Sequence, residues 1–249
     1  MIKIGKLTLN GTPRIAVVFR DNTPQDLLRK AKENGLDVAE LRIDQYTSFD
    51  RNHVLKEISK FKNFPTIATI RSHKECGGWN LSEKQRLSLF KAILPKIDAI
   101  DIELSSKEIL DQAVKAAHSA GKLVIISYHS FDQTPKADVL NKIFEQAKSL
   151  GADIVKIATM ALNRTDIQTL AAFTIANSGK NLITIAMGTQ GVISRIFFPS
   201  LGSLMTYASL GEPTAPGQLH YDMTFDLLRI LYPKFNQEKI EKLKILENA

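Results

Sequence analysis

The chain has 249 residues, of which 44% are hydrophobic, and its 33 Lys and Arg residues exceed its 26 Asp and Glu residues, giving a formal net charge of +7. This composition is typical of a globular protein and excludes an intrinsically disordered chain or a disulfide-stapled one. Cys76 is the one cysteine, which excludes an internal disulfide and a thiolate-rich zinc site. A single thiol also fits a reducing compartment, and we expect the cytoplasm.

The first eleven residues alternate apolar and polar side chains around Lys3 and Lys6, which predicts a short β-hairpin rather than a secretion signal. No apolar run approaches the roughly 18 residues of a membrane-spanning helix, so we expect no membrane partner. The lysines are spread over many segments, without a basic run that contains aromatic residues, so we also expect no nucleic-acid partner. The positive charge suits a small anionic substrate instead.

Eight short, β-branched apolar runs alternate with amphipathic stretches of helical length. They begin near Ile15, Val38, Pro65, Asp98, Lys122, Asp153, Asn181 and Ser203. This alternation, without any linker, predicts a single catalytic domain over residues 1–249. We expect an α/β protein, an eight-stranded parallel (β/α)8 TIM barrel with the hairpin at its N-terminus. A doubly wound open sheet is the competing architecture, but no G-x-G-x-x-G pattern follows the first strand.

Helix ends are marked by specific residues. Four glycines follow helical stretches and predict C-terminal caps: Gly35, Gly121, Gly151 and Gly179. At the other end of helices, Thr23 before Pro24 predicts an N-cap followed by a first-turn proline, and Ser82 with Gln85 predicts a capping box. These boundaries support the count of strand–helix units.

Charged residues interrupt several predicted strands, although strands covered on both faces are normally apolar. Glu40, Arg42 and Asp44 alternate with apolar residues, so all three lie on one face of the second strand. Similar positions on later strands are Arg71, Asp101, Glu103, His129 and Lys156. In a barrel this face is the interior, and catalytic residues lie at the C-terminal ends of strands. Strand-end charges that reach solvent or pair with one another are the alternative.

Lys156 lies within the apolar run 154–158, where a charged amine costs free energy unless it is paired or its pKa falls. We expect a lowered pKa, which would let the amine attack a ketone and form a Schiff base. His129 ends a predicted strand next to that of Lys156 and is the candidate proton shuttle; a purely structural histidine is the alternative. The histidines show no metal-binding spacing, so we expect no metal, although a site assembled across strands stays open.

Two glycine-containing loops follow the seventh and eighth predicted strands, at residues 187–195 and 214–218. Loops at these positions often bind phosphate in barrels, and Arg195 would equally suit a carboxylate. Tight connections between elements are the alternative explanation for the glycines. We expect an anion to bind here, without deciding which one.

Six ordered segments together resemble the type I 3-dehydroquinate dehydratases. They are ELRID at 40–44, TIRSHKECGG at 69–78, SYHSFDQTP at 127–135, DIVKIA at 153–158, MGTQGVISR at 187–195 and APGQ at 215–218. The resemblance implies an eight-stranded barrel, a homodimer and a lyase that dehydrates 3-dehydroquinate to 3-dehydroshikimate. This step belongs to the shikimate pathway, which leads to chorismate and the aromatic amino acids. No cofactor is implied, because the imine itself is the electron sink.

The resemblance also implies roles for individual residues. Lys156 becomes the Schiff-base lysine, His129 the general acid and base, and Glu75 the residue that orients and tunes His129. Six further positions match residues that hold the substrate: Glu40, Arg42, Arg71, Arg195, Thr214 and Gln218. Glu40, Arg42 and Arg71 would face the hydroxyl-bearing side of the substrate. Arg195 would bind the carboxylate of the substrate, and Thr214 and Gln218 would belong to a loop that closes over it.

This chain departs from the usual pattern of the family at two positions. Cys76 stands between Glu75 and the glycine pair, and Thr214 stands where serine is common. A class I aldolase or transaldolase-like barrel is the nearest alternative enzyme, since it also uses a lysine imine. A basic nucleic-acid-binding protein would explain the net charge but not Lys156.

Overall fold

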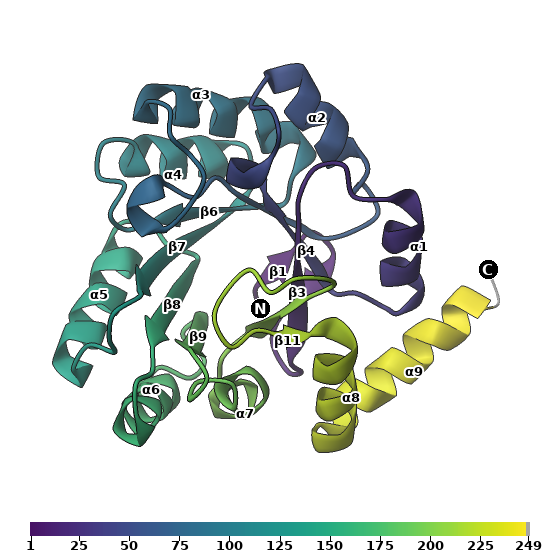
Figure 1. The fold of residues 1–249 in the computed structure, drawn as a ribbon, viewed down its shortest axis with the longest axis vertical. Coiled ribbons are helices and arrows are strands. Elements are labelled where there is room, and N and C mark those ends of the chain that lie inside the picture. The colour runs from purple at the N-terminus through teal and green to yellow at the C-terminus, as the bar shows by residue number, and fades with distance from the viewer. Residues whose placement is uncertain (248–249) are drawn as a thin grey trace.

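A computed structural model describes residues 1–247, so the last two residues of the predicted 1–249 domain lie outside the described residues. Within this part of the chain, nine strands form one parallel sheet that curls around a central axis (Figure 1). In sheet order they are β11 (Leu219–His220), β10 (Met205–Ser209), β3 (Arg14–Phe19), β4 (Val38–Arg42), β5 (Thr66–Thr69), β6 (Ala99–Glu103), β7 (Leu123–Ser130), β8 (Ile154–Met160) and β9 (Leu182–Met187).

Helices surround this sheet (Figure 1). They are α1 (Gln25–Glu33), α2 (Arg51–Ser59), α3 (Glu83–Ile93), α4 (Leu110–Ser119), α5 (Ala137–Ser149), α6 (Arg164–Ala176), α7 (Ser194–Leu201), α8 (Tyr221–Leu231) and α9 (Pro233–Glu247). Three short 3₁₀ turns, η1 (Ile43–Gln45), η2 (His73–Glu75) and η3 (Leu94–Lys96), lie between them. Of the helices in the described residues, none is both long and apolar enough to cross a membrane.

The eight predicted apolar runs correspond to β3 through β10, and the sheet they form nearly closes on itself. A parallel bridge joins Leu182 at the start of β9 to Ser203, and the amide of Leu204 donates to the carbonyl of Leu182 at 2.9 Å. The two-residue strand β11 was not predicted, because so short a segment carries no periodic pattern. The α/β architecture with parallel strands therefore follows the prediction, with one strand more than expected.

The predicted helix ends are correct except at two positions, Thr23 and Gly179. Gly35, Gly121 and Gly151 have positive φ and directly follow the C-cap residues of α1, α4 and α5. Gly179 also has positive φ but lies two residues beyond Asn177, the C-cap of α6. Ser82 and Gln85 form both hydrogen bonds of a capping box at α3. Thr23, however, does not cap α1: the N-cap position is Pro24, and the Thr23 hydroxyl donates to the carbonyl of Arg20 instead. The prediction was wrong there because a hydroxyl can satisfy a nearby turn as well as a helix terminus.

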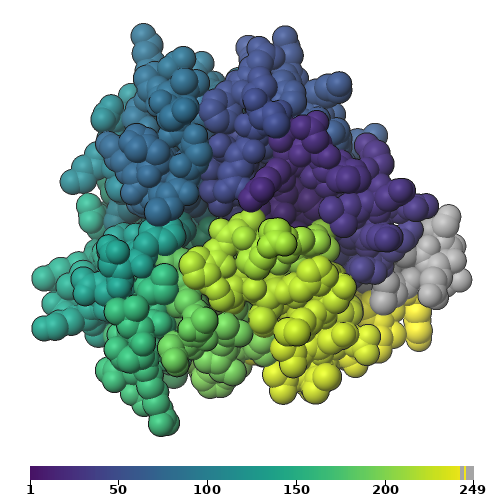
Figure 2. Space-filling model, in the orientation of Figure 1, coloured from purple at the N-terminus to yellow at the C-terminus, as the bar shows by residue number. Residues whose placement is uncertain are grey.

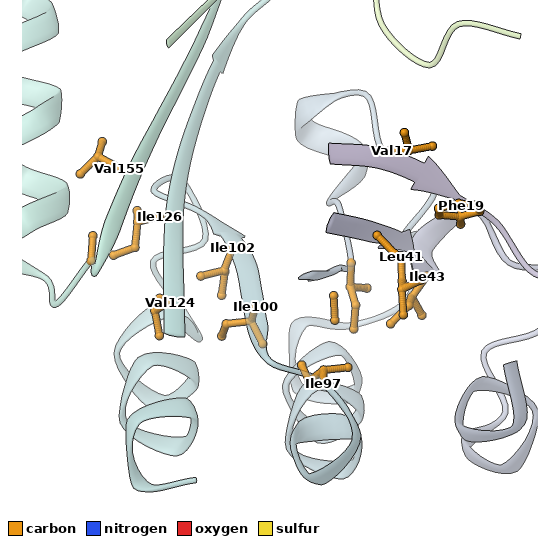
Figure 3. Close-up of a cluster of buried hydrophobic side chains, with 14 of the residues drawn as sticks. Val17, Phe19, Leu41, Ile43, Ile97, Ile100, Ile102, Val124, Ile126 and Val155 are labelled. Atoms are coloured by element: carbon orange, nitrogen blue, oxygen red, sulfur yellow. The ribbon is translucent and has the colours of Figure 1, made fainter. Parts of the chain in front are cut away.

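Buried apolar residues form two clusters, one on each face of the strands. The outer cluster packs the strands against the helices, and Figure 3 shows part of it, including Val17, Leu41, Ile100 and Ile126. The inner cluster contains a layer that we call the amino-terminal layer: Ala16, Val38, Ile67, Ala99, Ile125, Ile154, Ile183 and Met205. Both clusters follow from strands that alternate their side chains between two covered faces.

The amino-terminal layer is covered by the first residues of the chain. β1 (Lys3–Ile4) and β2 (Leu7–Thr8) pair antiparallel, with Lys3 opposite Thr8 and Ile4 opposite Leu7. Ile4 and Leu9 are buried in the inner cluster. This end of the interior is therefore filled by apolar side chains, and the space for a ligand lies at the opposite end of the strands.

Candidate active site

A pocket opens at the C-terminal ends of the strands, and all nine predicted site residues line it. They are Glu40, Arg42, Arg71, Glu75, His129, Lys156, Arg195, Thr214 and Gln218. Apolar or unassigned neighbours in the lining include Val18, Phe131, Ile185, Met187 and Tyr207. The segment between β10 and β11, yellow-green in Figure 1, crosses the centre of the view, and its atoms lie over the centre in Figure 2. Sequence-distant residues therefore meet under one loop.

Lys156 lies in the middle of β8 with its amine inside the curled sheet. Its relative exposure is 5%, and Nζ donates to Oδ2 of Asp101 at 2.9 Å. Oε1 of Glu40 lies 3.6 Å from the same nitrogen, and the ring centroid of Tyr207 lies 4.4 Å from it. The amine is thus buried but has two carboxylate neighbours and an aromatic face, which all favour the ammonium form.

The expected lowering of the Lys156 pKa is wrong for this arrangement. Burial alone lowers the pKa of an amine, but the charges of Asp101 and Glu40 outweigh it, so the pKa of Lys156 is raised above its ordinary value. The sequence showed the apolar neighbours along β8, whereas the carboxylates come from β6 and β4. Lys156 therefore rests as an ammonium ion and needs to lose a proton before it can act as a nucleophile.

Asp101 connects the lysine to the rest of the charged residues. Its side chain is fully buried, its Oδ1 accepts from Nη2 of Arg71 at 2.8 Å, and the Ser127 hydroxyl donates to Oδ1 at 2.6 Å. Burial would raise the pKa of this carboxyl, but Arg71 and Lys156 lower it overall. The sequence placed Asp101 on the polar face without giving it a role; only its position opposite Lys156 reveals that role.

His129 and Glu75 form the second functional pair. Nδ1 of His129 lies 2.8 Å from Oε2 of Glu75, and the Ser105 hydroxyl donates to Oε1 of Glu75 at 2.5 Å. Burial, together with the charges of Arg71 and Lys156, holds the pKa of His129 well below its usual range, so the imidazole is neutral. When Glu75 is ionised it accepts the Nδ1 proton, which leaves Nε2 as a proton acceptor.

The proton affinity of Glu75 is matched to neutral pH. Burial raises the pKa of its carboxyl to about 7, although the Ser105 hydrogen bond and Arg71 act in the opposite direction. Glu75 therefore changes protonation near pH 7, whereas the imidazole of His129, whose pKa is lowered, stays neutral there. A neutral imidazole hydrogen-bonded to a carboxyl that titrates near pH 7 suits proton transfer to and from a substrate.

The turn that carries Glu75 accommodates the additional Cys76. Cys76 adopts a left-handed conformation with φ of 56°, and the following residues are Gly77 and Gly78. A Cβ at Gly77 would lie 2.1 Å from the carbonyl oxygen of Arg71, and one at Gly78 would lie 2.1 Å from that of Asp44. Only glycine permits this backbone approach. The extra residue leaves Glu75 in contact with His129.

Arg42 and Arg71, both predicted to hold substrate, already have carboxylate partners. Arg42 donates from Nε and Nη2 to the two oxygens of Asp44, at 2.9 and 2.8 Å. Arg71 lies 3.1 Å from Glu103 through Nη1, in addition to its contact with Asp101. These pairs fix the direction of both guanidinium groups in the pocket lining.

Arg195 differs from the other two arginines because it is buried beside carbonyl groups only. Nη2 donates to the carbonyl of Pro216 at 3.1 Å and Nη1 to that of Tyr207 at 3.5 Å. Among the side chains that the structure describes, no carboxylate forms an ion pair with it, and burial lowers its pKa to about 10. A buried guanidinium without an anion is costly, so the pocket offers a place for an anionic ligand.

The loop over Arg195 is held by its own side chains. Oε1 of Gln218 accepts from the backbone amide of Thr214 at 2.7 Å and from its hydroxyl at 3.0 Å. Thr214 thus retains the hydroxyl of the serine that is common at this position, and the hydroxyl binds within the loop. Across the described part of the chain, no group of three or more His, Cys, Asp or Glu side chains is arranged to hold a metal ion.

Comparisons with known proteins agree with this arrangement. The family model of type I 3-dehydroquinase matches residues 15–234. The 3-dehydroquinate dehydratase of Thermodesulfovibrio yellowstonii is 35% identical over 229 residues, which cover 90% of this chain and 98% of that protein.

Solved structures are similar too. The enzyme of the same name from Aquifex aeolicus is 36% identical, with a TM-score of 0.80 over 88% of this chain and 99% of that one. The type I enzyme from Clostridium difficile, solved with covalent modified comenic acid, is 30% identical, with a TM-score of 0.81 over 90% of this chain and 94% of that one.

Proposed function

Because this chain belongs to the type I 3-dehydroquinase family and is a hydro-lyase that dehydrates 3-dehydroquinate in the shikimate pathway, we propose that Lys156 forms the Schiff base. The observation that carries this proposal is the pocket itself, which encloses a buried lysine, a histidine bonded to a carboxylate, and an arginine that no described carboxylate pairs with. These groups supply a nucleophile, a base and an anion site.

Imine formation begins with the loss of a proton from Lys156. The neutral imidazole of His129 lies two residues further along β7 than Ser127, whose register partner on β8 is Lys156, so both side chains face the same interior. His129 accepts the proton, the freed amine attacks the ring ketone, and the resulting carbinolamine loses water. Asp101 and Glu40 stabilise the positive charge that returns to nitrogen in the iminium ion.

Dehydration follows from the electron demand of the iminium ion. His129 removes a proton from the carbon next to the imine, the electron pair moves toward nitrogen, and the neighbouring hydroxyl leaves as water. Glu75 holds the Nδ1 proton of His129, so that Nε2 serves as the base. Hydrolysis of the imine then releases 3-dehydroshikimate and restores Lys156. No metal or organic cofactor takes part in this scheme.

The remaining residues orient the substrate. Arg195 binds the carboxylate under the loop that Thr214 and Gln218 hold together, while Glu40, Arg42 and Arg71 face the hydroxyl groups. Arg195→Ala should raise KM by about 10- to 100-fold, since a hydrogen bond to a charged group contributes about 1.5 to 3 kcal/mol. An unchanged KM would remove Arg195 from this role.

The assembly is also part of the proposal. We infer that the curled sheet forms a complete eight-stranded barrel with the N-terminal hairpin at one end. The barrel is a single domain over residues 1–249, and the enzyme works in the cytoplasm.

Exposed apolar side chains on three successive helices, Ile175 on α6, Phe197 on α7 and Ile230 on α8, support a homodimer. Sedimentation equilibrium at micromolar concentration distinguishes this dimer from a monomer.

Borohydride trapping tests the central proposal. Sodium borohydride added with 3-dehydroquinate should reduce the imine and leave a stable adduct, which peptide mass mapping should place on Lys156. Lys180→Ala, which changes an exposed lysine outside the pocket, should trap as well as the unaltered protein. An adduct on any other lysine would overturn the assignment. A product with conjugated-enone absorbance shows dehydration, whereas two carbon fragments would show aldol cleavage.

A further inference from the structure

The hydroxyl of Tyr207 is buried in the pocket beside the amine of Lys156. Tyr207 lies on β10 two residues after Met205, so its side chain also faces the interior, and its relative exposure is 4%. Among the described side chains its oxygen has no partner at good hydrogen-bond geometry, although the amine of Lys156 lies near enough to act on the phenol as a donor. An unsatisfied buried hydroxyl is costly and calls for a functional explanation.

The position of Tyr207 links the two groups that would hold opposite ends of the substrate. Its ring centroid lies 4.4 Å from Nζ of Lys156, while its backbone carbonyl accepts from Nη1 of Arg195 at 3.5 Å. A substrate that reaches from the amine to the guanidinium would therefore pass along this tyrosine. The ketone oxygen would lie beside the amine that attacks its carbon.

The protonation state of Tyr207 suits a hydrogen-bond donor. Burial, together with the negative charges of Glu40 and Asp101, raises the pKa of the phenol, although the charge of Lys156 acts in the opposite direction. The hydroxyl therefore keeps its proton at neutral pH and can donate to an oxygen atom. It does not act as a base.

We propose that the hydroxyl of Tyr207 donates a hydrogen bond to the ketone oxygen of the substrate while Lys156 attacks the carbonyl carbon, an inference that rests on the proposed function. In this step the nitrogen lone pair forms the carbon–nitrogen bond, and the carbonyl π electrons move onto oxygen. Tyr207 stabilises that developing negative charge and keeps its own proton. The oxygen then takes a proton from the nitrogen, a further proton is delivered by His129, and water leaves.

The hydroxyl can be removed without disturbing the ring. Tyr207→Phe keeps the aromatic face over the amine and removes one unsatisfied polar group, so its Tm should be equal to or higher than that of the unaltered protein. Tyr46→Phe is the matched control, because the Tyr46 hydroxyl is also buried and without a partner, but Tyr46 does not line the pocket.

The experiment measures how fast the imine forms, by mixing protein with 3-dehydroquinate and stopping the reaction with borohydride at successive times. Tyr207→Phe should form adduct about 100-fold more slowly, the lower end of the effect of losing one oxyanion donor. Tyr46→Phe should match the unaltered protein. Affinity for 3-deoxyquinate, which has the carboxylate but no oxygen at the attacked carbon, should stay within twofold in both variants.

The outcomes separate the two proposals. If the unaltered protein forms no adduct on Lys156, the proposed function fails. If it does, and Tyr207→Phe forms adduct at the same rate, the role of Tyr207 is wrong. A Tyr207→Phe variant that loses affinity for 3-deoxyquinate as strongly as it loses adduct formation would show a packing role and would also overturn the inference.

Discussion

The two ends of the sheet interior differ sharply in chemistry, although they are separated by only two residues along each strand. The amino-terminal layer is entirely apolar and is covered by the hairpin. The next layer, which we call the carboxyl-terminal layer, contains Glu40, Thr69, Asp101, Ser127, Lys156 and Tyr207, all buried. On the same face of each strand, Lys156 lies two residues after Ile154, and Asp101 lies two residues after Ala99. An apolar side chain in one layer is therefore next to a charged side chain in the other.

The amino-terminal layer contributes mainly to the stability of the fold, whereas the carboxyl-terminal layer carries the groups proposed for catalysis. Burial of the amino-terminal layer stabilises the fold through the hydrophobic effect, without directional requirements. In the carboxyl-terminal layer, each buried charge is costly unless a partner of opposite charge is placed by another strand. Lys156 on β8 therefore depends on Asp101 on β6 and Glu40 on β4. Substitutions in the two layers should consequently have different effects.

The largest effect is expected for Lys156→Ala. Loss of the amine removes the covalent route altogether, so turnover of 3-dehydroquinate should fall below detection and no borohydride adduct should form. Steady-state assays with mass spectrometry measure both quantities. Turnover close to that of the unaltered protein would mean that the carboxyl-terminal layer does not act through an imine.

The second effect concerns His129→Ala, which removes the base but leaves the amine. Turnover should fall by about 10²- to 10⁴-fold, the usual contribution of a positioned acid or base. Substrate binding, measured by calorimetry, should remain within a few-fold. A variant that turns over normally would exclude His129 as the proton shuttle.

The third effect tests the charge balance of the carboxyl-terminal layer through Asp101→Asn. Because the folded pKa of Asp101 is lowered, its ionisation stabilises the fold above the unfolded pKa of about 3.9. Asn should therefore reduce the free energy of unfolding at pH 7 by about 3 to 5 kcal/mol, the cost of breaking a buried ion pair. As the pH falls below about 3.9, the difference from the unaltered protein should shrink. A difference that is constant with pH would contradict this account.

The smallest effect on catalysis is expected in the amino-terminal layer, for Ile154→Ala. The cavity should reduce the free energy of unfolding by about 2 to 5 kcal/mol. Under conditions where the variant is folded, kcat and KM should remain near those of the unaltered protein. Urea titration and steady-state kinetics provide the two measurements. A large fall in kcat would show that the layers are coupled rather than separate.

Much of the fold could be predicted from residue patterns, and the site residues from those patterns together with the family resemblance, which supplied Glu75, Thr214 and Gln218. The eight apolar runs gave β3 through β10, and the nine residues chosen for the site all line one pocket. Tyr207 was overlooked because a tyrosine in an apolar strand resembles an ordinary core residue. The direction of the Lys156 pKa was wrong because the neighbours that decide it are 55 residues away at Asp101 and further at Glu40.

The sequence by itself determined which side chains face the interior, because alternation along a strand is a local property of the backbone. It also determined that a lysine and a histidine lie near the same ends of adjacent strands. Only the tertiary structure decided that Lys156 is paired with Asp101, that no described carboxylate pairs with Arg195, and that the Tyr207 hydroxyl lies buried beside the Lys156 amine. Electrostatic free energy depends on distances between strands, and those distances exist only once the sheet has curled.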